Sequence, residues 1–170
     1  MEKYALLIIN MINEYVFGEN KCENPKEIIG PIRNASSLFR EKSFPVIYLN
    51  DSNKNDSEEE IIEDLAPKEG DFIIKKRKYS GFYGTELEEI LEKKGIKNLV
   101  FSGLQTSLSV RHTAADAYYR DYKCIMLTNA CCDVKKDLHL KSILYIRDYY
   151  GASAVSTMNF PRLYLSKEEI

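Results

Sequence analysis

Six short apolar runs alternate along this chain with segments of helical pattern, and this alternation limits the possible folds more than any other feature. The runs cover residues 4–10, 45–50, 71–75, 98–103, 123–129 and 153–158. Most are continuously apolar, which is typical of parallel strands that are buried on both faces. Helices are predicted over residues 25–41, 85–94, 107–120 and 136–150. The sequence therefore predicts an α/β fold with three layers, a six-stranded, mostly parallel, doubly wound sheet with helices on both faces.

Local signals support the predicted helix ends. Thr85 and Glu88 have the spacing of a capping box at the start of the second helix. Gly95 and Gly151 follow predicted helices and are expected to end them. Residues 50–71 are acidic and contain Pro67 and Gly70, so we expect a solvated excursion with a short helix over 58–65. A lid over a site is the alternative for this segment.

Composition limits the class of protein and its partners. The chain has 170 residues, of which 44% are hydrophobic and 29% charged, so we predict one globular domain over 1–170. The formal net charge is −2, and the one basic cluster, 75–78, follows an apolar strand. Nucleic acid and membranes are therefore poor candidate partners.

The four cysteines are Cys22, Cys124, Cys131 and Cys132, with no CxxC pair and no metal spacing. We expect reduced thiols and a cytoplasmic location. Adjacent Cys131 and Cys132 should point to opposite faces of a strand and be buried as small hydrophobic side chains.

Polar residues gather at the expected carboxyl ends of the strands. Asn10, Asp51, Lys76 and the segment 104–109 each follow an apolar run. In open α/β sheets, ligands bind outside this edge, where the strand order reverses. The sequence thus predicts a small-molecule site that these residues share.

Three collinear motifs carry a resemblance to a known family. They are ALLIINMINEYV, KRKYSGFYGT and GLQTSLSVRHTAADA, and together they extend over nearly the whole chain. The chain resembles the isochorismatase-like cysteine hydrolases, which include nicotinamidases and N-carbamoylsarcosine amidohydrolases. The catalytic Asp, Lys and Cys of that family fall on Asn10, Lys76 and Ser109.

The resemblance implies a reaction for which two of the three residues are changed. In the family, the aspartate takes the thiol proton, and the sulfur attacks a carbonyl or nitrile carbon. Backbone N–H groups hold the oxyanion next to a cis peptide bond, which here would join Leu104 and Gln105. Asn10 cannot accept a proton, and Ser109 is a weaker nucleophile than cysteine. Vinyl-ether hydrolysis, which some relatives perform without the cysteine, needs the missing aspartate as acid. We therefore expect the family's standard activity to be lost.

Lys76 leaves three functions open. With no aspartate beside it, burial favours the neutral amine, which could activate Ser109 in a hydrolase of amide-like small molecules. A charged Lys76 could instead bind an anion such as a carboxylate, together with the helix N-terminus near Ser109. In the third interpretation, the three triad residues only bond one another, and the protein is a structural subunit of an oligomer.

No cofactor or metal is expected. Asp51 is followed at position 53 by Asn53 where the zinc-binding relatives would have histidine. His112 lies three residues after Ser109, so a local Ser-His pair is an alternative, but we expect a packed or interface histidine. His139 is expected to be a surface or packing residue.

The remaining predictions concern the walls of the site and the partner. The predicted pocket residues are Tyr15, Asp51, Tyr79, Phe82, Leu104 and Gln105. Tyrosines at the ends of the helices 107–120 and 136–150 suit a protein interface. Since members of the resembled family are commonly dimers or tetramers, we expect a homo-oligomer.

Overall fold

The computed structural model describes residues 2–19, 21–52 and 60–166, and within them it contains one parallel sheet. The strand order is β3-β2-β1-β4-β5-β6, and every neighbouring pair is parallel. The strands are β1 (Tyr4–Ile9), β2 (Val46–Asp51), β3 (Phe72–Lys76), β4 (Asn98–Leu104), β5 (Lys123–Cys132) and β6 (Ser153–Val155). This confirms the predicted six-stranded, doubly wound architecture.

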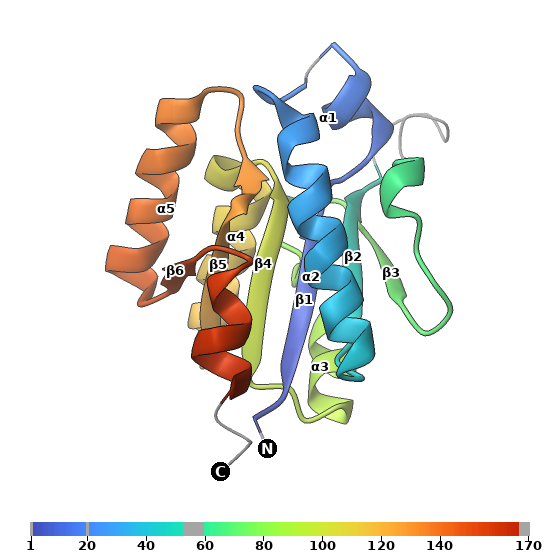
Figure 1. Ribbon diagram of the computed structural model, residues 1–170, viewed down its shortest axis with the longest axis vertical. Helices are drawn as coiled ribbons and strands as arrows, with labels where there is room; N and C mark the ends of the chain where they lie inside the picture. The colour runs from blue at the N-terminus through green and yellow to red at the C-terminus, as the bar shows by residue number, and fades with distance from the viewer. Residues whose placement is uncertain (1, 20, 53–59, 167–170) are drawn as a thin grey trace.

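Helices cover both faces of the sheet (Figure 1). They are α1 (Asn13–Phe17), α2 (Ile29–Glu41), α3 (Leu87–Lys93), α4 (Arg111–Tyr118) and α5 (Lys136–Tyr150). Helix α2 and the C-terminal turn Pro161–Leu165 lie on one face, whereas α3 and α4 lie on the other. Each face thus has its own hydrophobic cluster, and α5 adds Ile143 and Ile146 to the cluster of α3 and α4.

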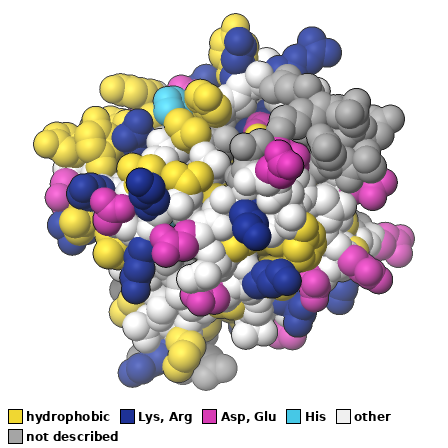
Figure 2. Space-filling view, turned by 90° about the horizontal axis from the view of Figure 1, so that it is seen from above, with side chains coloured by type: hydrophobic (Ala, Val, Ile, Leu, Met, Phe, Trp, Pro, Cys, Tyr) yellow, Lys and Arg dark blue, Asp and Glu magenta, His cyan; other side chains and the backbone are white. Residues whose placement is uncertain are grey.

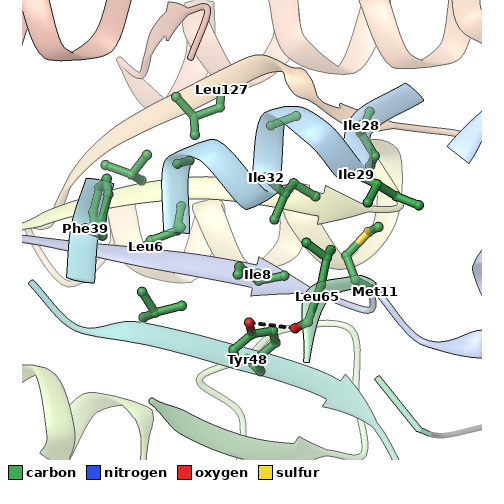
Figure 3. Packing of buried hydrophobic residues seen from close by; sticks show 14 of the residues in the cluster. Leu6, Ile8, Met11, Ile28, Ile29, Ile32, Phe39, Tyr48, Leu65 and Leu127 are labelled. Atoms are coloured by element: carbon green, nitrogen blue, oxygen red, sulfur yellow. Dashed lines mark hydrogen bonds between the residues drawn. The ribbon is translucent and has the colours of Figure 1, made fainter. Parts of the chain in front are cut away.

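The central strands supply both clusters because successive side chains point to opposite faces. In β1, Leu6 and Ile8 pack beneath α2, and Leu7 and Ile9 pack on the other face. Figure 3 shows the first cluster, in which the Tyr48 hydroxyl donates to the Leu65 carbonyl at 2.8 Å. Burial on both faces explains why these strands are continuously apolar in sequence.

Several predicted boundaries are shifted. The segment 107–120 begins as a π-helical turn, Thr106–Val110, before α4, and we call it the Ser109 turn. The helix predicted over 25–41 begins as a 3₁₀ turn, Pro25–Ile28. The short helix predicted over 58–65 is a 3₁₀ turn at Glu63–Leu65, and residues 58 and 59 lie outside the described residues.

The predicted capping box at α3 is wrong. The Thr85 hydroxyl accepts a hydrogen bond from Leu87 N at 3.3 Å. In a capping box the donor would be the N–H of residue 88, three positions after Thr85, and not that of residue 87. The Glu88 carboxylate accepts from Arg120 Nε at 3.2 Å instead of turning back to the helix start. Arg120, in the turn after α4, thus takes the side chain that the local motif would use. Gly95 and Gly151 do end their helices, with φ of 65° and 62°.

The strand order reverses between β1 and β4. From β1 the chain continues to β2 on one side of the sheet, and from β4 it continues to β5 on the other side. Gly103 permits a close approach at this point. Its φ is 105°, and a Cβ atom would lie 2.0 Å from the carbonyl oxygen of Ile9. The ends of β1 and β4 therefore meet tightly beside Asn10 and the Ser109 turn.

Charged side chains of both signs are interspersed on the face seen from above, and hydrophobic side chains gather toward one flank (Figure 2). Within the described ranges, no helix is both long and apolar enough to cross a bilayer.

Candidate active site

The site begins with a pair of residues at the ends of neighbouring strands. Asp51 ends β2 and Lys76 ends β3, and the two residues are partners in the strand register. Lys76 is completely buried, and its Nζ atom forms an ion pair with Asp51 Oδ1. Burial lowers the pKa of Lys76, and the Asp51 carboxylate acts in the opposite direction. The buried ammonium therefore has a negative partner.

Asn10 joins this pair to Ser109. It follows β1 with φ of 53°, a left-handed conformation that asparagine tolerates better than most residues. Its Oδ1 accepts from Asp51 N at 3.0 Å, which fixes the orientation of the amide. Its Nδ2 then donates to Asp51 Oδ2 at 2.9 Å and to Ser109 Oγ at 3.2 Å. Residue 10 therefore presents donors, where an aspartate would present acceptors.

Ser109 is buried, with 2% of its surface exposed, and its hydroxyl meets two donors. Lys76 Nζ and Asn10 Nδ2 each lie 3.2 Å from Ser109 Oγ. Both lone pairs of the hydroxyl are thus engaged, which leaves its hydrogen for an acceptor elsewhere. The peptide bond between Leu104 and Gln105 is cis, as the resemblance implies.

The position of Asp51 corrects one expectation. The sequence predicts Lys76 without an aspartate beside it, because residue 10 is Asn. In the structure, Asp51 at the end of the neighbouring strand β2 lies beside Lys76. The signal was present in the sequence, since Asp51 and Lys76 end consecutive strands that become neighbours in the sheet. The predicted lone amine is therefore wrong.

The loop after Lys76 is fastened to α4. Ser80 Oγ donates to Asp116 Oδ2, and Gly81 N donates to Thr113 Oγ1 at 2.9 Å. Thr113 in turn donates to the carbonyl oxygen of Ser109 at 2.7 Å. The YSGF and TAADA motifs thus include contacts that hold the loop against the Ser109 turn.

Tyr15 and Tyr79 differ in their contacts. The Tyr15 hydroxyl donates to Asp51 Oδ2 at 2.9 Å, and burial followed by the Asp51 charge raises the pKa of Tyr15. Tyr79 is 53% exposed, and its ring lies 5.4 Å from that of His112. His112 Nδ1 pairs with the carbonyl oxygen of Leu108 at 2.8 Å, which fits the predicted packing role.

The other predicted pocket residues are more enclosed. Phe82 and Leu104 are buried in the two hydrophobic clusters, with 5% and 0% of their surfaces exposed. Gln105 is half-buried at the start of the Ser109 turn. Of the six predicted pocket residues, Asp51 has a direct hydrogen bond to the triad position Asn10, and Tyr15 is connected to the triad through Asp51.

A second polar network contacts the Ser109 turn and was not predicted. The buried Asp133 carboxylate accepts from Ser107 N at 2.6 Å and from Val134 N at 2.8 Å. Thr106 Oγ1 donates to the Cys132 carbonyl at 3.0 Å and lies 2.9 Å from His139 Nδ1. Asp133 follows directly after β5, so its place at a strand end was the available signal.

Two of the buried cysteines, Cys124 and Cys131, are unsuited to act as a nucleophile in place of Ser109. Cys131 and Cys132 lie in β5 and pack against opposite clusters, as predicted. Burial raises the pKa of Cys124 and of Cys131 to about 12, so both thiols stay protonated near neutral pH.

Within the described part of the chain, no three His, Cys, Asp or Glu side chains are arranged to hold a metal ion. Asn53, on which the zinc prediction rests, lies outside it.

Known proteins resemble this chain over most of its length. The model of the isochorismatase domain matches residues 4–158. An uncharacterized isochorismatase family protein, YaaI of Bacillus subtilis, is 31% identical over 134 residues, which are 69% of this chain and 74% of YaaI. The crystal structure of N-carbamoylsarcosine amidase from Thermoplasma acidophilum is 34% identical, with a TM-score of 0.85 over 91% of this chain and 96% of that one.

Other relatives are considerably longer than the matched region. The ureidoacrylate amidohydrolase RutB of Acinetobacter baylyi is 37% identical over 93 residues, which are 54% of this chain and 38% of that enzyme. The chain thus spans well under half the length of this curated relative.

Proposed function

Because the chain belongs to the isochorismatase family, we propose that it is a hydrolase-fold protein that binds a small molecule at Asn10, Lys76 and Ser109 without the family's cysteine chemistry. One observation carries this proposal. The Ser109 hydroxyl accepts hydrogen bonds from both Asn10 Nδ2 and Lys76 Nζ, each at 3.2 Å.

The direction of these hydrogen bonds argues against a nucleophilic serine in this arrangement. A base must accept the proton of the attacking group, and residue 10 offers an amide N–H in that direction. Lys76, paired with Asp51, also donates. The site therefore acts as a set of donors, to which the Ser109 hydroxyl adds its own hydrogen. Such a set suits a ligand with an acceptor oxygen.

The ion pair also bears on the charge of the ligand. The sequence predicts a carboxylate or other anion, on the basis of a free Lys76 charge. Asp51 balances that charge, so the pair offers little net attraction to an anion. We therefore propose a neutral carbonyl compound, such as a small amide, ahead of a carboxylate. The names of two relatives, N-carbamoylsarcosine amidase and ureidoacrylate amidohydrolase, agree with an amide-like group as the part that binds, but N-carbamoylsarcosine and ureidoacrylate also carry a carboxylate and so do not favour a neutral compound over an anion.

A thermal-shift measurement tests this function. A panel of small amides and their matching carboxylates is added to the wild type and to Ser109→Ala and Lys76→Met. We expect amides to raise the Tm of the wild type, by an amount that grows with concentration, and to have a smaller effect on both variants. If no compound of either class shifts the wild type, the binding proposal is wrong. A shift by carboxylates alone would restore the anion interpretation.

A second candidate function is an active serine hydrolase, and the contact between Lys76 Nζ and Ser109 Oγ favours it. The lowered pKa of Lys76 acts in the same direction. A fluorophosphonate probe should then label Ser109, and labelling should disappear in Ser109→Ala and Lys76→Ala. Absence of labelling in the folded wild type after long incubation excludes this candidate.

Self-association is proposed for the tyrosine-rich ends of α4 and α5. Tyr119 and Tyr149 are 76% and 66% exposed, and Tyr118 is 45% exposed. Large exposed aromatic side chains are enriched in protein interfaces. Light scattering should give the mass of a dimer or tetramer, and Tyr119→Ser combined with Tyr149→Ser should shift it toward that of the monomer. A monomeric wild type would exclude both the oligomer and the role as a structural subunit.

A further inference from the structure

The carboxylate of Asp51 lies among three donors that come from three different segments. Lys76 Nζ of β3 pairs with Oδ1, and Asn10 Nδ2 and the Tyr15 hydroxyl each donate to Oδ2 at 2.9 Å. The backbone N–H of Asp51 also donates to Asn10 Oδ1 at 3.0 Å. We propose that Asp51 has taken over from residue 10 as the counter-ion of Lys76, so that the carboxylate of this site has moved from the first strand to the second.

The charge balance of the buried site supports this assignment. Lys76 has no exposed surface, and a buried ammonium without a counter-ion is strongly disfavoured. One carboxylate balances it. A second carboxylate at position 10 would stand where Asn10 Nδ2 now lies 2.9 Å from Asp51 Oδ2. Two carboxylates so close cannot both be ionised easily. Asn10 is therefore the residue that fits beside Asp51.

With the carboxylate at position 51, the group at position 10 that contacts Ser109 is an amide N–H donor instead of a carboxylate oxygen. Asn10 lies between the Asp51 carboxylate and Ser109 Oγ, and its amide group donates to both. Asp51 acts on Ser109 through Lys76 and Asn10, and it is therefore a positioning residue. Among the residues that the structure describes, the other ionisable groups near Asp51 are Tyr15, which donates to it, and Glu14 and Tyr79, which lie near Tyr15.

A charge-conserving exchange tests the proposal directly. In Asn10→Asp/Asp51→Asn, the carboxylate returns to position 10 and the number of charges is unchanged. Asp51→Asn alone removes it at nearly constant shape. The ionisation of Lys76 is followed in each protein by NMR of labelled lysine side chains, with the Lys76 signal assigned by its absence in Lys76→Met.

We expect Asp51→Asn to lower the titration midpoint of Lys76 by at least one pH unit, a tenfold change in its proton affinity. The double exchange should restore most of this shift, which a purely structural role of Asp51 would not produce. An unchanged midpoint in Asp51→Asn overturns the proposal, as does a double exchange that titrates like the single variant.

If Asp51→Asn does not fold, the pair can be removed as a whole. Asp51→Leu/Lys76→Met has no buried charge left, and it should fold if the defect of the single variant is the uncompensated lysine. If this double variant also fails to fold, the packing of Asp51, and not its charge, is what matters, and the proposal is wrong.

A second measurement uses a thiol as a reporter. We compare alkylation by iodoacetamide in Asn10→Asp/Ser109→Cys, which has two carboxylates, and in Asn10→Asp/Asp51→Asn/Ser109→Cys, which has one. Mass spectrometry identifies the modified position. The first should react at least tenfold more slowly at pH 7, because two negative charges disfavour the thiolate. Equal rates contradict the proposal. No ligand is used in either measurement, so their outcome is independent of the proposed binding function.

Discussion

Two polar networks contact the Ser109 turn, and they differ in what they hold. The network of Asp51, Asn10 and Lys76 reaches the side chain of Ser109. The network of Asp133 and Thr106 reaches the backbone of the turn and of β5. The first therefore depends on the chemical identity of the residue at 109, whereas the second does not. A turn that is held through its backbone can therefore keep its shape whichever residue stands at position 109.

The largest expected effect is on the backbone network. Asp133→Ala removes the acceptor of the buried Ser107 N and of the part-buried Val134 N, and both N–H groups lose their carboxylate partner. We expect the free energy of unfolding to fall by about 3 kcal/mol in urea denaturation. Asp133→Asn, which keeps one acceptor oxygen, should lose less. A loss below about 1 kcal/mol in Asp133→Ala would mean that this network does not hold the turn.

The side-chain network should be weaker and dependent on pH. Asp51→Asn removes the counter-ion of Lys76, and we expect a loss of about 2 kcal/mol at pH 7, less than the roughly 3–5 kcal/mol for a fully buried pair because the Asp51 side chain is 17% exposed. The folded pKa of Lys76 is already lowered by burial, so the folded state binds fewer protons than the unfolded state just below the ordinary lysine pKa. The stability of the variant should therefore rise with pH in that range.

Urea denaturation at several pH values checks this second effect. The difference between wild type and Asp51→Asn should shrink as the pH approaches the ordinary lysine pKa, because a neutral amine needs no counter-ion. A difference that stays constant with pH would assign the loss to packing.

A smaller effect is expected for one neutral hydrogen bond of the backbone network. Thr106→Val keeps the shape of the side chain and removes the hydroxyl that donates to the Cys132 carbonyl. We expect a loss of about 1 kcal/mol. Thr106→Ser, which keeps the hydroxyl, is the matched control, and it should be closer to the wild type. Equal losses in both variants would show that the methyl group matters more than the hydrogen bond.

The smallest effect concerns an exposed ion pair remote from both networks. Lys93 Nζ lies 2.5 Å from Glu89 Oε1 on the surface of α3. Water screens such pairs, so Glu89→Gln should leave the urea midpoint unchanged within error. A clear loss would indicate that single charge changes destabilise this protein wherever they occur, and the contrast between the two networks would then lose its meaning.

The sequence predicts the architecture well because continuous apolar strands can be buried only in a covered parallel sheet. It also brings Asn10, Lys76 and Ser109 to one edge, since each follows a strand. The sequence places Asp51 and Lys76 at strand ends, but it does not give the register that aligns them as an ion pair. Nor does it predict Asp133 at Ser107 N, because side-chain contacts to the backbone of a distant turn leave no periodic pattern.

The alignment of Asp51 with Lys76 has a consequence for how such a site can change through successive mutations. From an ancestor with aspartate at position 10, loss of that aspartate first would leave a buried lysine alone. Gain of Asp51 first would crowd two carboxylates, and a later change of residue 10 to asparagine would then relieve the crowding. The second order has the less unfavourable intermediate, because Lys76 keeps a counter-ion throughout. Reversal meets the same barrier, so a single mutation at position 10 no longer leads back.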